Sequence, residues 1–243
     1  MQVPTSTDAA KGRLLARPRL GPGPRTVVPG RKALGLATKR DGLVRVPEGA
    51  PTGALPLILM LHGAGGNAAG ALGLTEHAAP DAILLLPESR GPSWDVIRGA
   101  YGPDVAFLDA ALEQVFQQHR VDPRRVALAG FSDGASYALS LAIGNGDLCT
   151  HALAFSPGFA APPNPMGRPL IFVSHGTEDA VLPIDGCSRR LVPELRRAGY
   201  EVRYREFSGG HYVPANCAAE AVDLLDANER RTSGSAGGDR RLD

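Results

Sequence analysis

Apolar residues gather in short uninterrupted runs from position 55 onward, and several of the segments between them repeat apolar positions at helical spacing. Such runs are typical of strands buried on both faces of a mainly parallel sheet, because a half-exposed strand alternates apolar and polar residues. The expected strands read LPLILMLHG, AILLLPES, RRVALAGFS, HALAFSPG and PLIFVSHG. Strands alternating with helices predict an α/β fold with a mainly parallel, doubly wound sheet and helices on both faces.

Two of the intervening segments show the helices most clearly. In DVAFLDAALEQVFQQHR, apolar side chains fall on one helical face, and IDGCSRRLVPELRRAG ends at Gly199, a residue suited to terminate a helix. In sheets of this kind, functional groups collect just beyond the carboxyl ends of the strands. The loops that follow the strands are therefore where we look for chemistry.

The two ends of the chain differ from its middle. Residues 1–30 are rich in Gly, Pro and Arg, which predicts a flexible or surface-wrapped arm, and 230–243 predicts a disordered tail. Between them, 31–229 is expected to form a single domain. It begins with two short strands around Asp41 and Gly42, a dipeptide that tolerates the positive φ angles of a tight hairpin turn.

Composition and charge narrow the function classes. The 243 residues are 43% hydrophobic, enough for a full core, and the net charge of +1 gives no field that would attract nucleic acid. The three cysteines lie far apart without a CxxC pair, which argues against a zinc site or a disulfide framework. No apolar run is long enough for a transmembrane segment, and no secretory leader is evident, so a cytoplasmic location is expected.

One short motif carries the strongest chemical signal. Gly130-Phe131-Ser132-Asp133-Gly134 fits GxSxG, with an apolar strand before it and an Ala/Ser-rich segment after it. A strand-to-helix turn this tight strains the serine backbone, and only glycine at the flanking positions leaves room for the crossing chain. Ser132 is therefore the candidate nucleophile, although a serine that merely caps the helix is the simpler alternative.

A serine hydroxyl needs a base and an orienting acid before it can attack a carbonyl. Asp179 follows the strand IFVSHG, and His211 follows the next strand, VRYREF. The chain order Ser, Asp, His, with the acid and the base each after a successive strand, is what this hydrolase architecture requires. Glu178 is a rival acid and His175 a rival base, which we expect to hydrogen-bond local backbone instead.

An oxyanion hole is the remaining requirement of acyl transfer. The backbone N–H of Asp133 is one expected donor, and the loop after LPLILMLHG supplies the other, with Ala64 preferred and Gly63 second. The same loop also fits GxGxxA, and Glu88 lies downstream as in a dinucleotide fingerprint. Nucleotide binding is thus a competing interpretation, which would leave the Ser, Asp and His pattern unexplained.

Taken together, LHGAGG, PSWD, GFSDGAS, HGTEDAVLP and GGHYVP resemble the phospholipase/carboxylesterase group, the acyl-protein-thioesterase-like branch of the α/β-hydrolase superfamily. The resemblance covers roughly residues 55–228. It implies Ser132 as nucleophile, Asp179 as acid and His211 as base, hydrolysing a small-molecule carboxylic ester or thioester with no cofactor and no metal. The residue after the nucleophile is Asp133 in this chain, where relatives commonly carry Gln, and this difference argues against a thioesterase preference. Polyester depolymerases and feruloyl esterases share a similar serine arrangement and remain alternatives.

Two further features bear on the substrate. Only FAAPPNPMGR separates HALAFSPG from PLIFVSHG, where lipases insert a helical cap, so we expect an uncapped, shallow groove. Trp94 lies on a Gly/Pro-rich loop after a strand and is either a substrate-binding aromatic, together with Gly63, or a core residue beneath that loop. A non-catalytic binding module on the same scaffold is the second functional class.

Overall fold

The computed structural model describes residues 6–19, 28–49 and 53–234, with 227–234 described by backbone alone. Within these ranges, eight strands form one sheet: β1 (Gly30–Ala33), β2 (Gly42–Val46), β3 (Leu55–Leu61), β4 (Ile83–Pro87), β5 (Val121–Phe131), β6 (His151–Phe155), β7 (Leu170–Gly176) and β8 (Val202–Phe207). The helices are α1 (Ser6–Ala10), α2 (Ala68–Thr75), a 3₁₀ turn η1 (Asp95–Arg98), α3 (Pro103–Gln118), α4 (Asp133–Gly144), α5 (Ser188–Arg197) and α6 (Ala215–Gly234).

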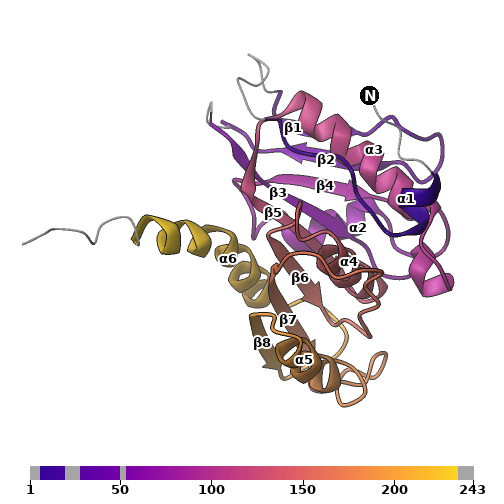
Figure 1. Ribbon diagram of the computed structural model, residues 1–243, viewed down its shortest axis with the longest axis vertical. Helices are drawn as coiled ribbons and strands as arrows, with labels where there is room; N and C mark the ends of the chain where they lie inside the picture. The colour runs from indigo at the N-terminus through magenta and orange to yellow at the C-terminus, as the bar shows by residue number, and fades with distance from the viewer. Residues whose placement is uncertain (1–5, 20–27, 50–52, 235–243) are drawn as a thin grey trace, which may run out of the picture.

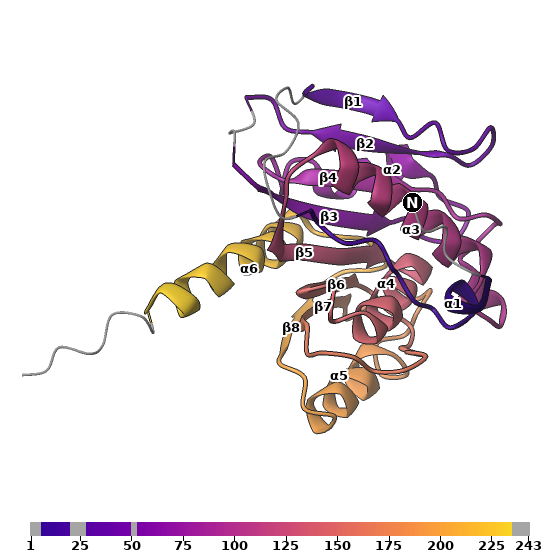
Figure 2. The same cartoon turned by 45° about the horizontal axis from the view of Figure 1, so that its top comes forward.

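The sheet order is β1-β2-β4-β3-β5-β6-β7-β8, and Figure 1 shows it as a twisted layer. The first two pairings, β1 with β2 and β2 with β4, are antiparallel, and all the others are parallel. Helices α3, α4 and α5 cover one face, while α2 and α6 cover the other (Figure 2). The expected α/β fold with helices on both faces is confirmed.

Two cores lie on either side of the sheet because the central strands are buried on both faces. In β3, Leu57 and Leu59 pack with α3 and α4, while Ile58 and Met60 pack with α2 and α6. All four side chains are fully buried. Period-two alternation sends successive side chains to opposite faces, which is why the sequence shows a continuous apolar run instead of an alternating one.

The expected tight hairpin turn at Asp41 and Gly42 is wrong in detail. The strands β1 and β2 do pair, but residues 34–41 form a loop between them, and Gly42 is already the first residue of β2. The Asp41 carboxylate accepts backbone N–H bonds from Gly35, Leu36 and Ala37, at 2.6, 2.8 and 3.0 Å. These three bonds stabilise a loop of residues 34–41, which takes the place of the expected two-residue turn.

The described part of the N-terminal arm lies against the domain. Leu14 is buried and its backbone N–H donates to Asn145 Oδ1 at 2.9 Å, just after α4. The N–H of Ala16 donates to Asp109 Oδ1 at 2.8 Å on α3. Residues 1–5 and 20–27 of the predicted arm lie outside the described residues.

The C-terminal helix and the connection between β6 and β7 complete the fold. The backbone of α6 continues to Gly234, into the predicted tail, and 235–243 lie outside the described residues. The connection from Ser156 to Pro169 between β6 and β7 contains no helix, as expected for an uncapped hydrolase. Among the described helices, none combines the length and apolar character needed to cross a bilayer.

Candidate active site

Ser132 lies at the corner between β5 and α4, at the carboxyl edge of the sheet. Its backbone has φ 58° and ψ −122°, a conformation that residues with a side chain rarely adopt. The N–H of Ser132 donates to Phe155 O at 2.9 Å, which fixes the corner to the end of β6. Ser132 is buried, with 8% of the residue exposed.

The glycines on either side of Ser132 are required by close backbone approach. A Cβ at Gly130 would lie 2.1 Å from Gly134 O, and a Cβ at Gly134 would lie 2.4 Å from both Leu61 O and His62 O. Helix α4 therefore begins in direct backbone contact with the end of β3. This explains physically why the sequence pattern brackets the serine with glycines.

His211 lies on the loop between β8 and α6, with its imidazole between Ser132 and Asp179. The Nδ1 atom is 2.6 Å from Asp179 Oδ2, and Nε2 is 2.9 Å from Ser132 Oγ. Because an ionised carboxylate only accepts, Nδ1 carries the proton and Nε2 is free to accept the serine hydroxyl. The Phe131 ring packs against the imidazole, with ring centroids 4.6 Å apart. The structure thus brings together the three side chains singled out by chain order.

Asp179 is held by its own loop as well as by His211. Oδ1 accepts N–H bonds from Val181 at 2.9 Å and from Leu182 at 2.8 Å, while Oδ2 faces His211. Burial opposes the charge on this carboxyl, but the hydrogen bonds from Leu182 N–H and His211 keep its pKa below the ordinary value. Asp179 is therefore an anion throughout the neutral range.

The two rival residues occupy other positions. Glu178 points toward the β8 loop, where its Oε1 accepts from Ser208 Oγ at 3.0 Å. His175 is fully buried, and its Nε2–H donates to Leu182 O at 2.8 Å, which leaves Nδ1 to accept from Ser188 Oγ at 2.6 Å. Burial lowers the pKa of His175, so the ring is neutral. His175 Nε2 lies 3.3 Å from Asp179 Oδ2, so this histidine contacts the acid and makes no hydrogen bond to Ser132.

The two expected oxyanion donors come from the loop after β3 and from the start of α4, which lie on either side of Ser132. A Cβ at Gly63 would lie 3.3 Å from Ser132 Cβ, so the loop after β3 passes directly beside the serine. Ala64 follows on the same loop. Asp133 is the first residue of α4, where backbone N–H groups have no partner within the helix. Its carboxylate accepts from Ser93 Oγ at 2.5 Å, which ties the β4–α3 connection to the serine corner.

The Trp94 side chain is fully buried, which favours the core alternative over a substrate-binding role. The indole Nε1–H donates to His62 O at 2.9 Å, and its ring stacks on Tyr137 with centroids 5.3 Å apart. Ser89 N–H donates to His62 Nε2 at 3.1 Å, and burial lowers the pKa of His62. The hydrogen bonds of Trp94 and Ser89 to His62 thus hold the start of the Gly63 loop in place.

The nucleotide alternative finds no support in the geometry. Glu88 Oε1 accepts the N–H of Ala68 at 3.2 Å, at the start of α2. In a dinucleotide fold, that helix N-terminus faces the negatively charged pyrophosphate. A carboxylate at this position would repel it. Among the residues that the structure describes, no group of three or more His, Cys, Asp or Glu side chains is arranged to bind a metal ion.

Several supporting residues were missed by the sequence reasoning. Ser93 falls within the PSWD motif, but nothing in the sequence indicated that its hydroxyl would reach Asp133. Ser188 contacts His175 from the first turn of α5, and Arg40 reaches the loops after β3 and β4. Each of these contacts depends on how distant segments pack, so no local pattern could have revealed it.

No protein-family model matches the chain. Among curated proteins, the chain is 29% identical over 226 residues to "Putative esterase NocK" of Nocardia uniformis subsp. tsuyamanensis, covering 87% of this chain and 64% of that protein. It is 30% identical over 158 residues to feruloyl esterase C of Emericella nidulans, covering 60% of this chain and 57% of that protein. The matches thus span less than two thirds of these relatives.

Solved structures give the same fold over most of the chain. Esterase PE8 superposes with a TM-score of 0.60 at 24% identity, covering 76% of this chain and 97% of that one. The Bacillus cereus carboxylesterase gives a TM-score of 0.60 at 20% identity, covering 76% and 92%. Identities this low establish the shared fold alone, and that fold agrees with the resemblance noted in the sequence.

Proposed function

We propose that this chain, which has the α/β-hydrolase fold, is a serine esterase acting on carboxylic esters. The observation that carries the proposal is the continuous chain of hydrogen bonds from Ser132 Oγ through His211 to Asp179, with distances of 2.9 and 2.6 Å. Nucleophile, base and orienting acid lie within the reach that acyl transfer requires. The sequence likeness to proteins named as esterases supports the same activity.

In the proposed mechanism, Ser132 Oγ attacks the ester carbonyl while His211 Nε2 takes its proton. The carbonyl oxygen becomes an oxyanion that accepts from the backbone N–H groups of Ala64 and Asp133, aided by the dipole of α4. Collapse of this intermediate expels the alcohol, which receives the proton from His211, and leaves Ser132 acylated. Water then attacks the acyl group with His211 again as the base, the bond to Ser132 Oγ breaks to release the carboxylic acid, and the proton returns from His211 to Ser132 Oγ. Asp179 stabilises the imidazolium each time.

The direct test is Ser132→Ala, assayed with p-nitrophenyl acetate and p-nitrophenyl butyrate. We expect turnover to vanish while the melting temperature stays close to that of the unchanged protein, because the hydroxyl donates no bond to the backbone of the fold. Labelling by a fluorophosphonate probe provides a second readout. A protein that carries no label and turns over neither ester would instead be a binding module on the hydrolase scaffold, and full turnover by the alanine variant would refute the role of Ser132.

Hydrolysis of feruloyl esters is a second candidate, favoured by the 30% identity to feruloyl esterase C. The helix-free connection between β6 and β7 leaves the edge above Ser132 without a helical cap, which suits a bulky ester. A panel of methyl ferulate, p-nitrophenyl butyrate and acyl thioesters of graded length distinguishes the substrates by their kcat/KM. A preference for methyl ferulate over the butyrate ester would favour this candidate, and the reverse order would exclude it.

A further inference from the structure

Arg40 adopts a strained backbone beside the candidate site. It lies on the loop between β1 and β2 with φ 52°, one of three non-glycine residues with positive φ among those the structure describes. Strained conformations of this kind persist only where surrounding contacts hold them in place, and they cluster at functional sites. The contacts made by the half-buried Arg40 side chain are therefore relevant to the site.

The Arg40 guanidinium joins two loops that follow neighbouring parallel strands. Its Nε–H donates to Ser89 O, and Nη2 donates to Ser89 Oγ at 2.9 Å, both on the connection after β4. The same Nη2 donates to Gly66 O at 3.3 Å and lies 3.4 Å from His62 Nε2, on the loop after β3. A planar fork with several donors can bridge two such loops, whereas an ammonium group presents a single compact charge.

One of these two loops, the loop after β3, is the one proposed to supply an oxyanion donor. Trp94 Nε1–H donates to His62 O at 2.9 Å and Gly65 N–H donates to Pro92 O at 2.8 Å, so the loop is fixed to the β4 connection on both sides of Ala64. Donors of an oxyanion hole must be held rigidly at the position where charge develops. Without the Arg40 bridge, only these other contacts would hold the loop beside Ser132.

We propose that Arg40 is a positioning residue for the oxyanion hole: by bridging Ser89 and Gly66 it holds the N–H of Ala64 in place for the transition state. This inference rests on the proposed esterase function. It assigns Arg40 no contact with the substrate. It therefore predicts a loss in kcat, which depends on the transition state, with a smaller effect on KM.

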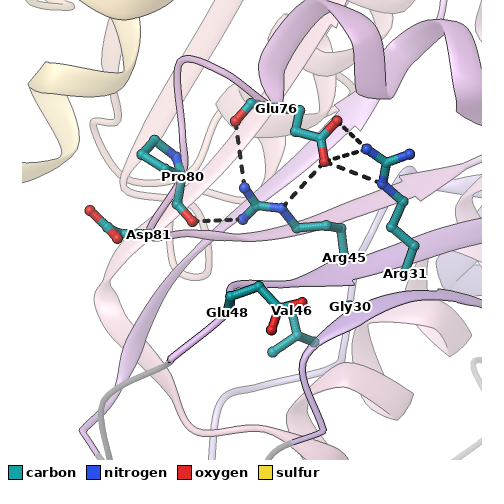
Figure 3. Close-up of a pocket in the computed structure, with 8 residues that line it drawn as sticks. All are labelled: Gly30, Arg31, Arg45, Val46, Glu48, Glu76, Pro80 and Asp81. Carbon is teal, nitrogen blue, oxygen red and sulfur yellow. Dashed lines mark hydrogen bonds and ion pairs between the residues drawn. The ribbon is translucent and has the colours of Figure 1, made fainter.

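Arg31, in the strand β1 that precedes the Arg40 loop, provides a matched control. Arg31 in β1 forms an ion pair with Glu76, with Nη2 to Oε2 at 2.6 Å, beside a pocket of about 460 Å³ (Figure 3). Arg45 of β2 and Asp81, just before β4, line the same pocket. It lies at the amino end of the parallel strands, away from Ser132. Arg31→Ala therefore removes a guanidinium from the same hairpin without touching the oxyanion loop.

The experiment compares Arg40→Ala, Arg40→Lys and Arg31→Ala for ester turnover and for inhibition by a short-chain trifluoromethyl ketone. With this probe, Ser132 Oγ adds to the ketone carbon, the carbonyl oxygen becomes an oxyanion and the proton passes to His211. We expect Arg40→Ala to lower kcat and weaken this inhibition by the same factor, on the order of 10- to 100-fold, which is less than the roughly 10²- to 10³-fold cost of a removed oxyanion donor because the donor is displaced and not deleted. KM should change by less than about 3-fold, and Arg31→Ala should match the unchanged protein.

Three results would overturn the inference. One is a kcat for Arg40→Ala within about 2-fold of the unchanged protein, an effect too small for a displaced donor. Another is a fall in kcat without weaker ketone inhibition, and the third is an equal fall in Arg31→Ala. If Arg40→Ala fails to fold, Arg40→Lys provides the same comparison, because it keeps the charge and loses the fork. Undiminished turnover by Ser132→Ala would instead refute the esterase proposal itself, so the two failures are distinguishable.

Discussion

Replacing Gly134 by alanine tests whether the serine corner depends on backbone contact between α4 and β3. The added Cβ would lie 2.4 Å from Leu61 O and from His62 O, while real Cβ atoms essentially never approach closer than 3.0 Å. The start of α4 must therefore move by about 0.6 Å, or the end of β3 must give way. Both neighbours are backbone atoms, one at the end of the central strand β3 and one just after it, so neither can rotate aside.

This displacement has two measurable consequences. Overpacking of this kind costs about 1–3 kcal/mol of unfolding free energy, which in a domain of this size lowers the melting temperature by roughly 2–12 °C. The shift also separates Ser132 and the Asp133 N–H from the loop at Gly63. Because a misplacement of about 1 Å can cost about 10²-fold in rate, we expect kcat to fall about 10-fold or more.

The assay is thermal unfolding together with p-nitrophenyl butyrate turnover, with Gly73→Ala as the control. Gly73 lies within α2, and a Cβ there meets no atom within 4 Å. The same substitution at Gly73 should leave kcat unchanged and stabilise the helix by up to about 1 kcal/mol. If Gly134→Ala melts and turns over like the unchanged protein, the contact between α4 and β3 does not control the site, and the reasoning fails.

Three further predictions concern the acid, the buried tryptophan and pH. Asp179→Asn should lower kcat on the order of 10⁴-fold through the wrong histidine tautomer, while Glu178→Gln changes it little; the reverse order would identify Glu178 as the acid. Trp94→Phe removes the donor to His62 O and should cost about 1–3 kcal/mol in denaturant unfolding, with an unchanged midpoint counting against this bond. Burial lowers the pKa of His151 to about 4, so the unfolded chain binds the proton first as pH falls. His151 therefore lowers stability between about pH 6.5 and 4, and His151→Gln should lose less stability over this range.

The features that sequence could predict are those set by local chemistry. The buried strands could be recognised because a strand covered by helices on both faces is apolar at nearly every position, as from Leu57 to Met60. The serine corner was visible because two backbone approaches under 3 Å exclude any side chain at Gly130 and Gly134. Chain order then led to Asp179 and His211, which the structure places in hydrogen-bond contact. Their catalytic roles stay a prediction.

The features that sequence could not predict depend on contacts between distant segments. A tryptophan on a Gly/Pro-rich loop is equally compatible with a substrate wall and a core, and only the packing against Tyr137 decides. The Asp41 loop widened because a carboxylate captured three backbone N–H groups, a bond pattern that a DG dipeptide does not specify. Arg40 gave no signal at all, since its partners lie more than 20 positions away.

Backbone strain in the described residues is concentrated at one edge of the sheet. The three non-glycine residues with positive φ are Ser132 after β5, Ser156 after β6 and Arg40, whose side chain holds the loops after β3 and β4. Ser156 N–H donates at 2.7 Å to Ser174 O, which belongs to β7, the strand that leads to Asp179. Each strained residue costs of order 1–3 kcal/mol, so the close packing of the two cores must offset it. Because the stable centre of the sheet supports a strained edge, we infer that core substitutions weaken this protein chiefly through stability, whereas substitutions at the edge act on the geometry around Ser132.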